Sequence, residues 1–128
     1  MDYVLFAWLS VIALGIVLVP YVMNFLNRKF LKTKNENYRN TLKFFRSLHK
    51  PAGLIFLIVA FIHGFMIMGS NMFRLHTGTL LYLSVFATAI LGGAFYRKKK
   101  RPLFKWHKIT ALITAILFFL HFFRPWAL

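Results

Sequence analysis

Four apolar stretches of about twenty residues each constrain this chain more than any other feature, because that length of helix spans a bilayer's hydrocarbon core. The chain has 128 residues, of which 59% are hydrophobic. We therefore predict an all-α integral membrane protein in which residues 1–128 form one four-helix bundle. The predicted spans are Tyr3–Asn27, Pro51–Gly69, His76–Tyr96 and Trp106–Phe123.

The first apolar stretch is expected to be a retained helix and not a secretory signal. It lacks a basic segment before it and a small-residue cleavage site after it, and it is longer than a signal's apolar region. Pro20 lies inside this stretch, where a membrane helix tolerates a kink. We expect this span to serve as packing scaffold.

The distribution of positive charge predicts the topology. Of 17 Lys and Arg residues, eight lie between Arg28 and Lys50 and seven between Arg97 and Lys108. The positive-inside rule places both basic segments in the cytoplasm and both termini outside. We expect a bacterial or archaeal cytoplasmic membrane. These segments are short and juxtamembrane, so we expect them to contact membrane lipid and no nucleic acid.

Two connecting regions leave alternatives open. The sequence YRNTLKFFRSLH, before the second span, favours either an amphipathic helix on the inner leaflet or an irregular loop. Pro51 predicts either an irregular start at His49 or a helix with Pro51 in its first turn. Pro102 is expected to stop the third helix before the fourth begins.

Four histidines carry the main functional signal. His49 and His63 are fourteen residues apart, and so are His107 and His121. That spacing places two imidazoles ~21 Å apart on nearly one face of a helix. The second and fourth spans run in the same direction, so His49 lies level with His107 and His63 level with His121. Facing neutral imidazoles are typical axial ligands of a b-type haem.

The sequence therefore predicts two haem b groups, an inner one between His49 and His107 and an outer one between His63 and His121. The alternative is that these histidines make interhelical hydrogen bonds or lie among lipid headgroups. Cysteine is absent, which excludes covalent c-type haem, cysteine-ligated clusters and disulfides. Asp2 and Glu36 are the only acids, so no carboxylate pair is available for acid–base chemistry in the spans.

Five further residues are candidates for cofactor binding. Gly78 and Gly92 are also fourteen residues apart, and we expect them either to let a porphyrin approach the backbone or to permit close helix packing. His76 is either an interfacial polar residue or a group that bonds a propionate, a quinone oxygen or an extracellular acceptor. Arg74 and Arg124 are candidates for the propionates of the outer haem.

The segments RSLHKPAGLIFLIVAFIHG and KWHKITALITAILFFLHFF resemble the haem-bearing helices of the ferric reductase-like transmembrane family. That family includes ferric reductases and NADPH oxidases, and respiratory cytochromes b share the histidine-pair pattern. The resemblance implies a di-haem cytochrome b core that passes electrons across a membrane. The reductases and oxidases carry a cytoplasmic flavin domain, which we do not find here, so we expect electrons from a separate protein or from quinol.

The function expected from these features is transmembrane electron transfer from an acidic cytoplasmic donor or a flavin-domain subunit to an acceptor outside. Whether the chain is itself a ferric, oxygen or quinone reductase is left open. One alternative is a quinone-reactive cytochrome b anchor of a larger oxidoreductase. Another is a haem-free small membrane transporter or assembly protein whose histidines pack or bind a transition metal.

Overall fold

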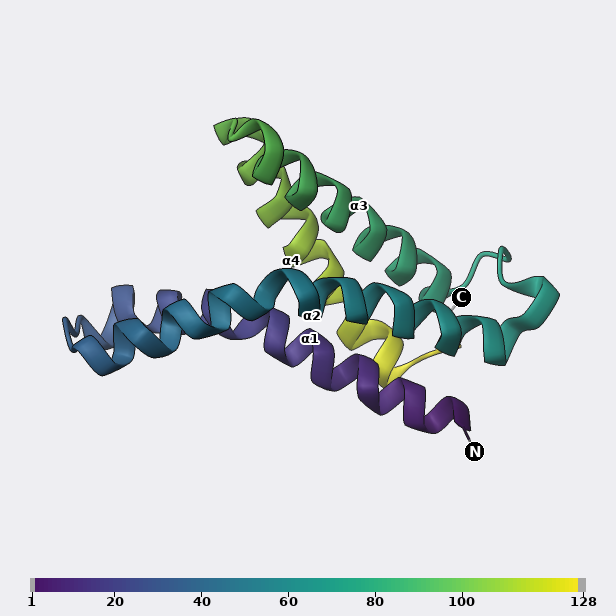
Figure 1. The fold of residues 1–128 in the computed structure, drawn as a ribbon. Helices are drawn as coiled ribbons and strands as arrows, with labels where there is room; N and C mark the ends of the chain where they lie inside the picture. The colour runs from purple at the N-terminus through teal and green to yellow at the C-terminus, as the bar shows by residue number, and fades with distance from the viewer. Residues whose placement is uncertain (1, 127–128) are drawn as a thin grey trace. The chain divides into compact units, whose positions relative to one another are not determined.

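The computed structural model describes residues 2–126, and nearly all of them are helical (Figure 1). No strand occurs in this range. The elements are α1 (Asp2–Leu26), a π-helix η1 (Asn27–Leu31), α2 (Glu36–Met68), a short 3₁₀ helix η2 (Gly69–Asn71), α3 (Thr77–Lys98) and α4 (Arg101–Phe123). Each of these four α-helices is long and apolar enough to cross a membrane. The predicted all-α class is confirmed, and so is the presence of four helices long and apolar enough to cross a membrane.

The helix surfaces suit hydrocarbon better than water. On α4, Leu112, Ile116 and Phe119 are 62%, 60% and 59% exposed and follow one another at helical spacing on one face. Thr114, on another face of the same helix, is buried at 5%. A soluble helix places its apolar side chains in the core and its polar ones in water. The reversed arrangement on α4 is what a lipid-facing helix requires.

The helix α2 begins at Glu36 and so extends well before the predicted span Pro51–Gly69. The segment before Pro51 is helical, as one of the two alternatives predicted, and is continuous with the rest of α2, while the irregular loop is wrong. Lys50 keeps helical geometry, so Pro51 costs α2 one backbone hydrogen bond without ending it. Both expectations for Pro51 were wrong, and His49 lies inside a continuous helix.

The connection between α3 and α4 consists only of Lys99 and Lys100. Lys99 has a left-handed conformation with φ of 53°, and its N–H donates to the carbonyl of Phe95, which ends α3. Pro102 lies in the first turn of α4, where its missing N–H has no helical partner to lose. The helix thus starts before the predicted Trp106, and Pro102 helps to begin α4.

The chain divides into two compact units, Met1–Val59 and Ala60–Leu128, with the boundary inside α2. In the first unit α1 and the first part of α2 run antiparallel, and the Tyr38 hydroxyl donates to the carbonyl of Met23 at 2.5 Å. Farther along the pair, apolar side chains line a small crevice: Leu9, Ile12, Ala13, Ile16, Ala52, Ile55 and Val59.

In the second unit, α3 and α4 form an antiparallel hairpin whose contact residues recur every seven positions. Gly78, Val85 and Gly92 recur at this spacing on α3, as do His107, Thr114 and His121 on α4. A seven-residue repeat keeps one seam of each helix facing its neighbour over a long contact. Fourteen residues, the histidine spacing, is two such repeats.

Hydroxyl groups join the two helices midway along this seam. The Ser84 and Thr114 hydroxyls are 2.5 Å apart, and the Thr88 hydroxyl is 3.2 Å from that of Thr114. Thr88 also donates to the carbonyl of Ser84 within α3. The two contacts with Thr114 are therefore the ones that join α3 to α4. Hydrogen bonds of this kind help to hold membrane helices together, at about 0.6 kcal/mol each. They hold α4 in the register that presents its two histidines to α3.

Candidate functional site

His107 is held against the backbone of the neighbouring helix. Its Nδ1 lies 2.8 Å from the carbonyl oxygen of Thr88 on α3. A carbonyl only accepts hydrogen bonds, so Nδ1 carries the proton and donates it. In the neutral ring the lone pair then belongs to Nε2, which is the nitrogen able to bind a metal.

His49 shows the same arrangement in the first unit. Its Nδ1 lies 3.0 Å from the carbonyl oxygen of Val17 on α1, and so again donates. Pro20 follows Val17 within one turn and lacks an N–H, which weakens the helical hydrogen bonding of that turn. The first span therefore supplies a histidine partner, a role beyond the packing scaffold predicted from the sequence.

His121 reaches the same protonation pattern through a side chain. Its Nδ1 lies 3.0 Å from the Thr77 hydroxyl oxygen, while that hydroxyl lies 2.5 Å from the carbonyl oxygen of Pro125. The single Thr77 proton goes to Pro125, so the Thr77 oxygen accepts from His121 Nδ1–H. Thr77 is 1% exposed, which shields this pair of hydrogen bonds from water.

Three of the four candidate ligands therefore share one arrangement, a donating Nδ1 and an Nε2 lone pair. Metal-binding histidines almost always donate their other ring N–H to a protein acceptor, because that bond fixes the tautomer and the ring orientation. Neutral imidazoles whose Nδ1 carries the proton are the ligands that bis-histidine haem binding through Nε2 requires. The residues present thus fit the predicted cofactor.

The two predicted histidine pairs differ in whether both members belong to the same compact unit. His63 and His121 belong to the same unit. His49 belongs to the first unit and His107 to the second, and their pairing stays a prediction of the sequence. All four rings are half-buried on their helices.

Gly78 and Gly92 lie directly against the α4 histidines. A Cβ at Gly92 would be 2.9 Å from Cε1 and 3.0 Å from Nδ1 of His107. A Cβ at Gly78 would be 3.1 Å from Cε1 of His121 and 3.1 Å from Nδ1 of His76. The glycines leave room for these imidazole edges, and clearance for a porphyrin stays a prediction. Gly93, next to Gly92, has no such neighbour within 4 Å.

His76 differs from the other histidines in its tautomer. It is the N-cap of α3, and its Nδ1 accepts a hydrogen bond from the backbone N–H of Gly78 at 3.0 Å. The neutral ring therefore carries its proton on Nε2, which is buried without a hydrogen-bond partner among the described residues. His76 is 8% exposed, so its ring is buried among protein groups.

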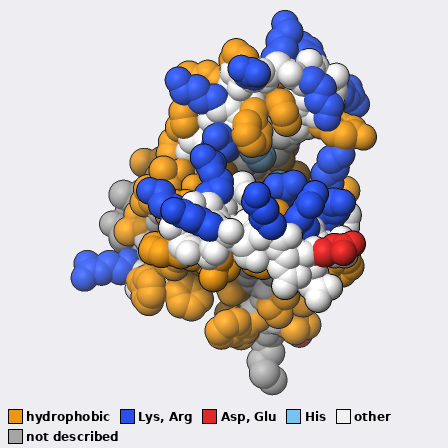
Figure 2. All heavy atoms as spheres, turned by 90° about the vertical axis from the view of Figure 1, so that its left-hand side faces the viewer, with side chains coloured by type: hydrophobic (Ala, Val, Ile, Leu, Met, Phe, Trp, Pro, Cys, Tyr) orange, Lys and Arg blue, Asp and Glu red, His pale blue; other side chains and the backbone are white. Residues whose placement is uncertain are grey.

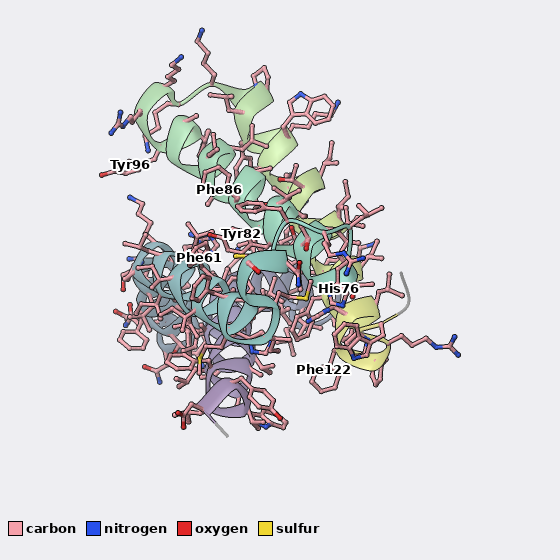
Figure 3. All side chains as sticks on the ribbon, turned by 90° about the vertical axis from the view of Figure 1, so that its right-hand side faces the viewer. Phe61, His76, Tyr82, Phe86, Tyr96 and Phe122 are labelled. Atoms are coloured by element: carbon pink, nitrogen blue, oxygen red, sulfur yellow. The ribbon has the colours of Figure 1, made fainter. Side chains whose placement is uncertain are left out.

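Figure 3 shows His76 at the end of the hairpin that also holds Phe122, and two aromatic rings contact its imidazole. Its ring centroid lies 5.8 Å from that of His121 and 4.8 Å from that of Trp126, both in edge-on contact. Arg74 and Arg124 are exposed and belong to the segments that flank this cluster, the loop before α3 and the residues after α4. Their predicted contact with propionates stays a prediction.

The opposite end of the hairpin is strongly basic. Figure 2 shows Lys and Arg side chains gathered over the α3–α4 connection, where the exposed run 97–101 contains only Arg and Lys. The Lys99 ammonium lies 4.6 Å from the ring centre of Tyr96, and that of Lys108 lies 4.9 Å from the ring centre of Phe104. Basic groups resting on aromatic rings are typical of a membrane interface.

Comparisons with protein-family models, with curated proteins and with solved structures find no match.

Sequence reasoning identified the histidines but missed the groups that orient them. The carbonyls of Val17 and Thr88 could not be recognised from the sequence as acceptors, because every residue has a backbone carbonyl. Thr77 did carry a signal, since a threonine beside Gly78 at the start of a helix is an available hydroxyl at the depth of His121.

Proposed function

We propose that this protein transfers electrons across a membrane by holding two b-type haems, one between His49 and His107 and one between His63 and His121. The observation that carries the proposal is the shared hydrogen bonding of three of these rings. In each, Nδ1 donates to a protein oxygen, at 3.0 Å for His49, 2.8 Å for His107 and 3.0 Å for His121. A packing role needs no such common orientation.

Each residue has a defined part in this function. The Nε2 atoms would bind the haem iron, while the Nδ1–H groups hold the rings in place and make Nε2 more basic. Gly78 and Gly92 let the α4 imidazoles lie close to the α3 backbone. The spans surround the site with apolar side chains, which lowers its polarity and restricts water. When bound, haem supplies the one-electron redox chemistry that these side chains lack.

The proposal includes a direction and a family likeness. Resemblance of the segments 46–64 and 105–123 to ferric reductase-like helices supports a path from the cytoplasmic side outward. The positive-inside rule supports the same orientation, because 15 of the 17 basic residues lie in the two segments assigned to the cytoplasm. The acceptor outside is then a small oxidant or a redox protein.

The function is tested with the purified haem-loaded protein in sealed lipid vesicles, with dithionite trapped inside and ferricyanide outside. We expect ferricyanide reduction well above the rate of protein-free vesicles. A variant with all four histidines replaced by alanine, in equal amount, should give only the protein-free rate. Equal rates for the haem-loaded protein and empty vesicles would refute transmembrane electron transfer.

The basic run at the α3–α4 connection is proposed to dock an acidic electron donor, such as a flavodoxin, a ferredoxin or a flavin-domain subunit. Neutralising Lys98, Lys99, Lys100 and Arg101 together to glutamine should lower the rate of association. The haem absorption spectrum should not change, because these side chains are exposed and lie outside the histidine contacts. Stopped-flow reduction by the acidic donor measures the effect.

Ionic strength provides the matching control. Salt shortens the Debye length from ~10 Å at 0.1 M to ~3 Å at 1 M, which screens the attraction between the basic run and an acidic donor. Reduction of the wild-type protein by that donor should therefore slow steeply as the salt concentration rises. The neutralised variant should show a much weaker salt dependence. Salt-independent reduction by quinol, together with unchanged kinetics of the variant, would show that the charges set topology only and that electrons enter from quinol.

A further inference from the structure

The end of the α3–α4 hairpin that holds His121 contains a buried hydrogen-bond donor with no acceptor. Nε2 of His76 carries the ring proton, because Nδ1 accepts from the backbone N–H of Gly78. The side chain is 92% buried, and Nε2 has no partner among residues 2–126. A buried donor without a partner costs about 1–3 kcal/mol. Such a group points to a partner that residues 2–126 do not supply.

The choice of residue at this position supports that reading. Asn, Asp, Ser and Thr are the preferred N-caps, and each would accept from Gly78 N–H with a shorter side chain that places no donor at the position of Nε2. Histidine caps α3 equally through Nδ1 but adds the Nε2–H donor. The cap alone therefore does not account for an imidazole at residue 76.

The surroundings of His76 favour a negatively charged acceptor. The N-terminus of α3 carries the positive end of its helix dipole, and this helix has 22 residues. Arg74 and Arg124 lie on the segments that flank it. The chain contains only two carboxylate side chains, Asp2 and Glu36, and both belong to the first unit.

We propose that Nε2–H of His76 donates to a propionate carboxylate of the outer haem, which makes His76 a positioning residue for that cofactor. This inference rests on the proposed function, in which His121 is an axial ligand. The rings of His76 and His121 are in edge-on contact, with centroids 5.8 Å apart. The periphery of haem b is hydrocarbon except for its two propionates, so a propionate is the only acceptor that the haem offers to this donor.

The decisive variant is His76→Asn, because asparagine keeps the cap and removes the donor at the position of Nε2. Its amide oxygen accepts from Gly78 N–H, as Nδ1 does, while its amide nitrogen takes the place of ring Cδ2 and does not reach the Nε2 position. A propionate that loses a donor exposes more negative charge to the iron, which favours the ferric state. We expect the reduction equilibrium constant of the outer haem to fall about threefold to tenfold, roughly 30 to 60 mV for a one-electron couple.

The measurement is a redox titration of the two haems in the purified, quinone-free protein, together with haem content. The inner haem serves as the internal control and should keep its wild-type potential. The redox-induced infrared difference spectrum should show a shifted propionate carboxylate band in His76→Asn. A second variant, Asp2→Asn, removes the one side-chain carboxylate that the predicted topology places on the outer side, and should leave both potentials unchanged.

Four outcomes overturn the inference. An unchanged outer potential in haem-loaded His76→Asn refutes it while leaving the proposed function intact. An effect that Asp2→Asn reproduces identifies a protein carboxylate as the partner. An effect that appears only after a quinone is added identifies a quinone oxygen instead. A wild-type protein without haem overturns both this inference and the proposed function.

Discussion

Replacing His63 or His121 by alanine is expected to leave about one haem per chain, and the same haem in both variants. In the proposed pairing, each substitution removes one of the two axial ligands of the outer haem, and a single neutral imidazole holds low-spin haem poorly. His63 and His121 fall in one unit. The haem that remains should have the absorption maximum and potential of the inner haem.

His49→Ala and His107→Ala form the complementary pair. Both should lose the inner haem and keep the outer one, because the sequence places these residues at equal depth on parallel helices. Haem content per chain, α-band position and redox titration identify which haem is lost. If His49→Ala and His121→Ala left the same haem, with one spectrum and one potential, the pairing proposed here would be wrong.

Gly92→Ala should weaken binding of the inner haem although it changes no ligand. The added Cβ would stand 2.9 Å from Cε1 and 3.0 Å from Nδ1 of His107, so the ring must move away from the Thr88 carbonyl that orients it. Overpacking of this kind costs about 1–3 kcal/mol, which corresponds to a loss of affinity on the order of tenfold or more. Haem retention during dilution into haem-free detergent, followed spectroscopically, measures the loss.

Gly93→Ala is the matched control, since it adds the same methyl group one residue away where nothing lies within 4 Å. This variant should bind both haems as the wild type does. Gly78→Ala should act on the outer haem and more weakly, because its Cβ would stand 3.1 Å from the nearest imidazole atoms. Equal haem retention in Gly92→Ala and Gly93→Ala would show that the glycine contact has no role in positioning His107.

The membrane spans were predictable because hydrophobic length alone determines them. The first and last residues of the helices were harder to predict, and α2 shows why. Pro51 favours a helix start by local sterics, yet α2 continues through it from Glu36. One lost hydrogen bond is a small cost when the rest of a helix of 33 residues holds the backbone in place. A local preference was overridden by the cooperativity of the helix.

The candidate site was likewise predictable only in part. The sequence shows two equal spacings, that of His107 and His121 and that of Gly78 and Gly92. Both follow the seven-residue repeat of the contact between α3 and α4. What the glycines contact was not visible, since spacing alone does not specify the register between two helices. The His76 cap was also missed, because its tautomer depends on the Gly78 N–H that it accepts from.

The most direct test of the central claim is the haem content and absorption spectrum of the purified chain, produced in cells supplied with ample haem. Four histidines and no cysteine predict two haems b per chain, extractable by acid acetone, with low-spin α-bands after dithionite reduction. The two sites lie in different surroundings, so the α-band should be split. A colourless, correctly inserted protein would contradict the account.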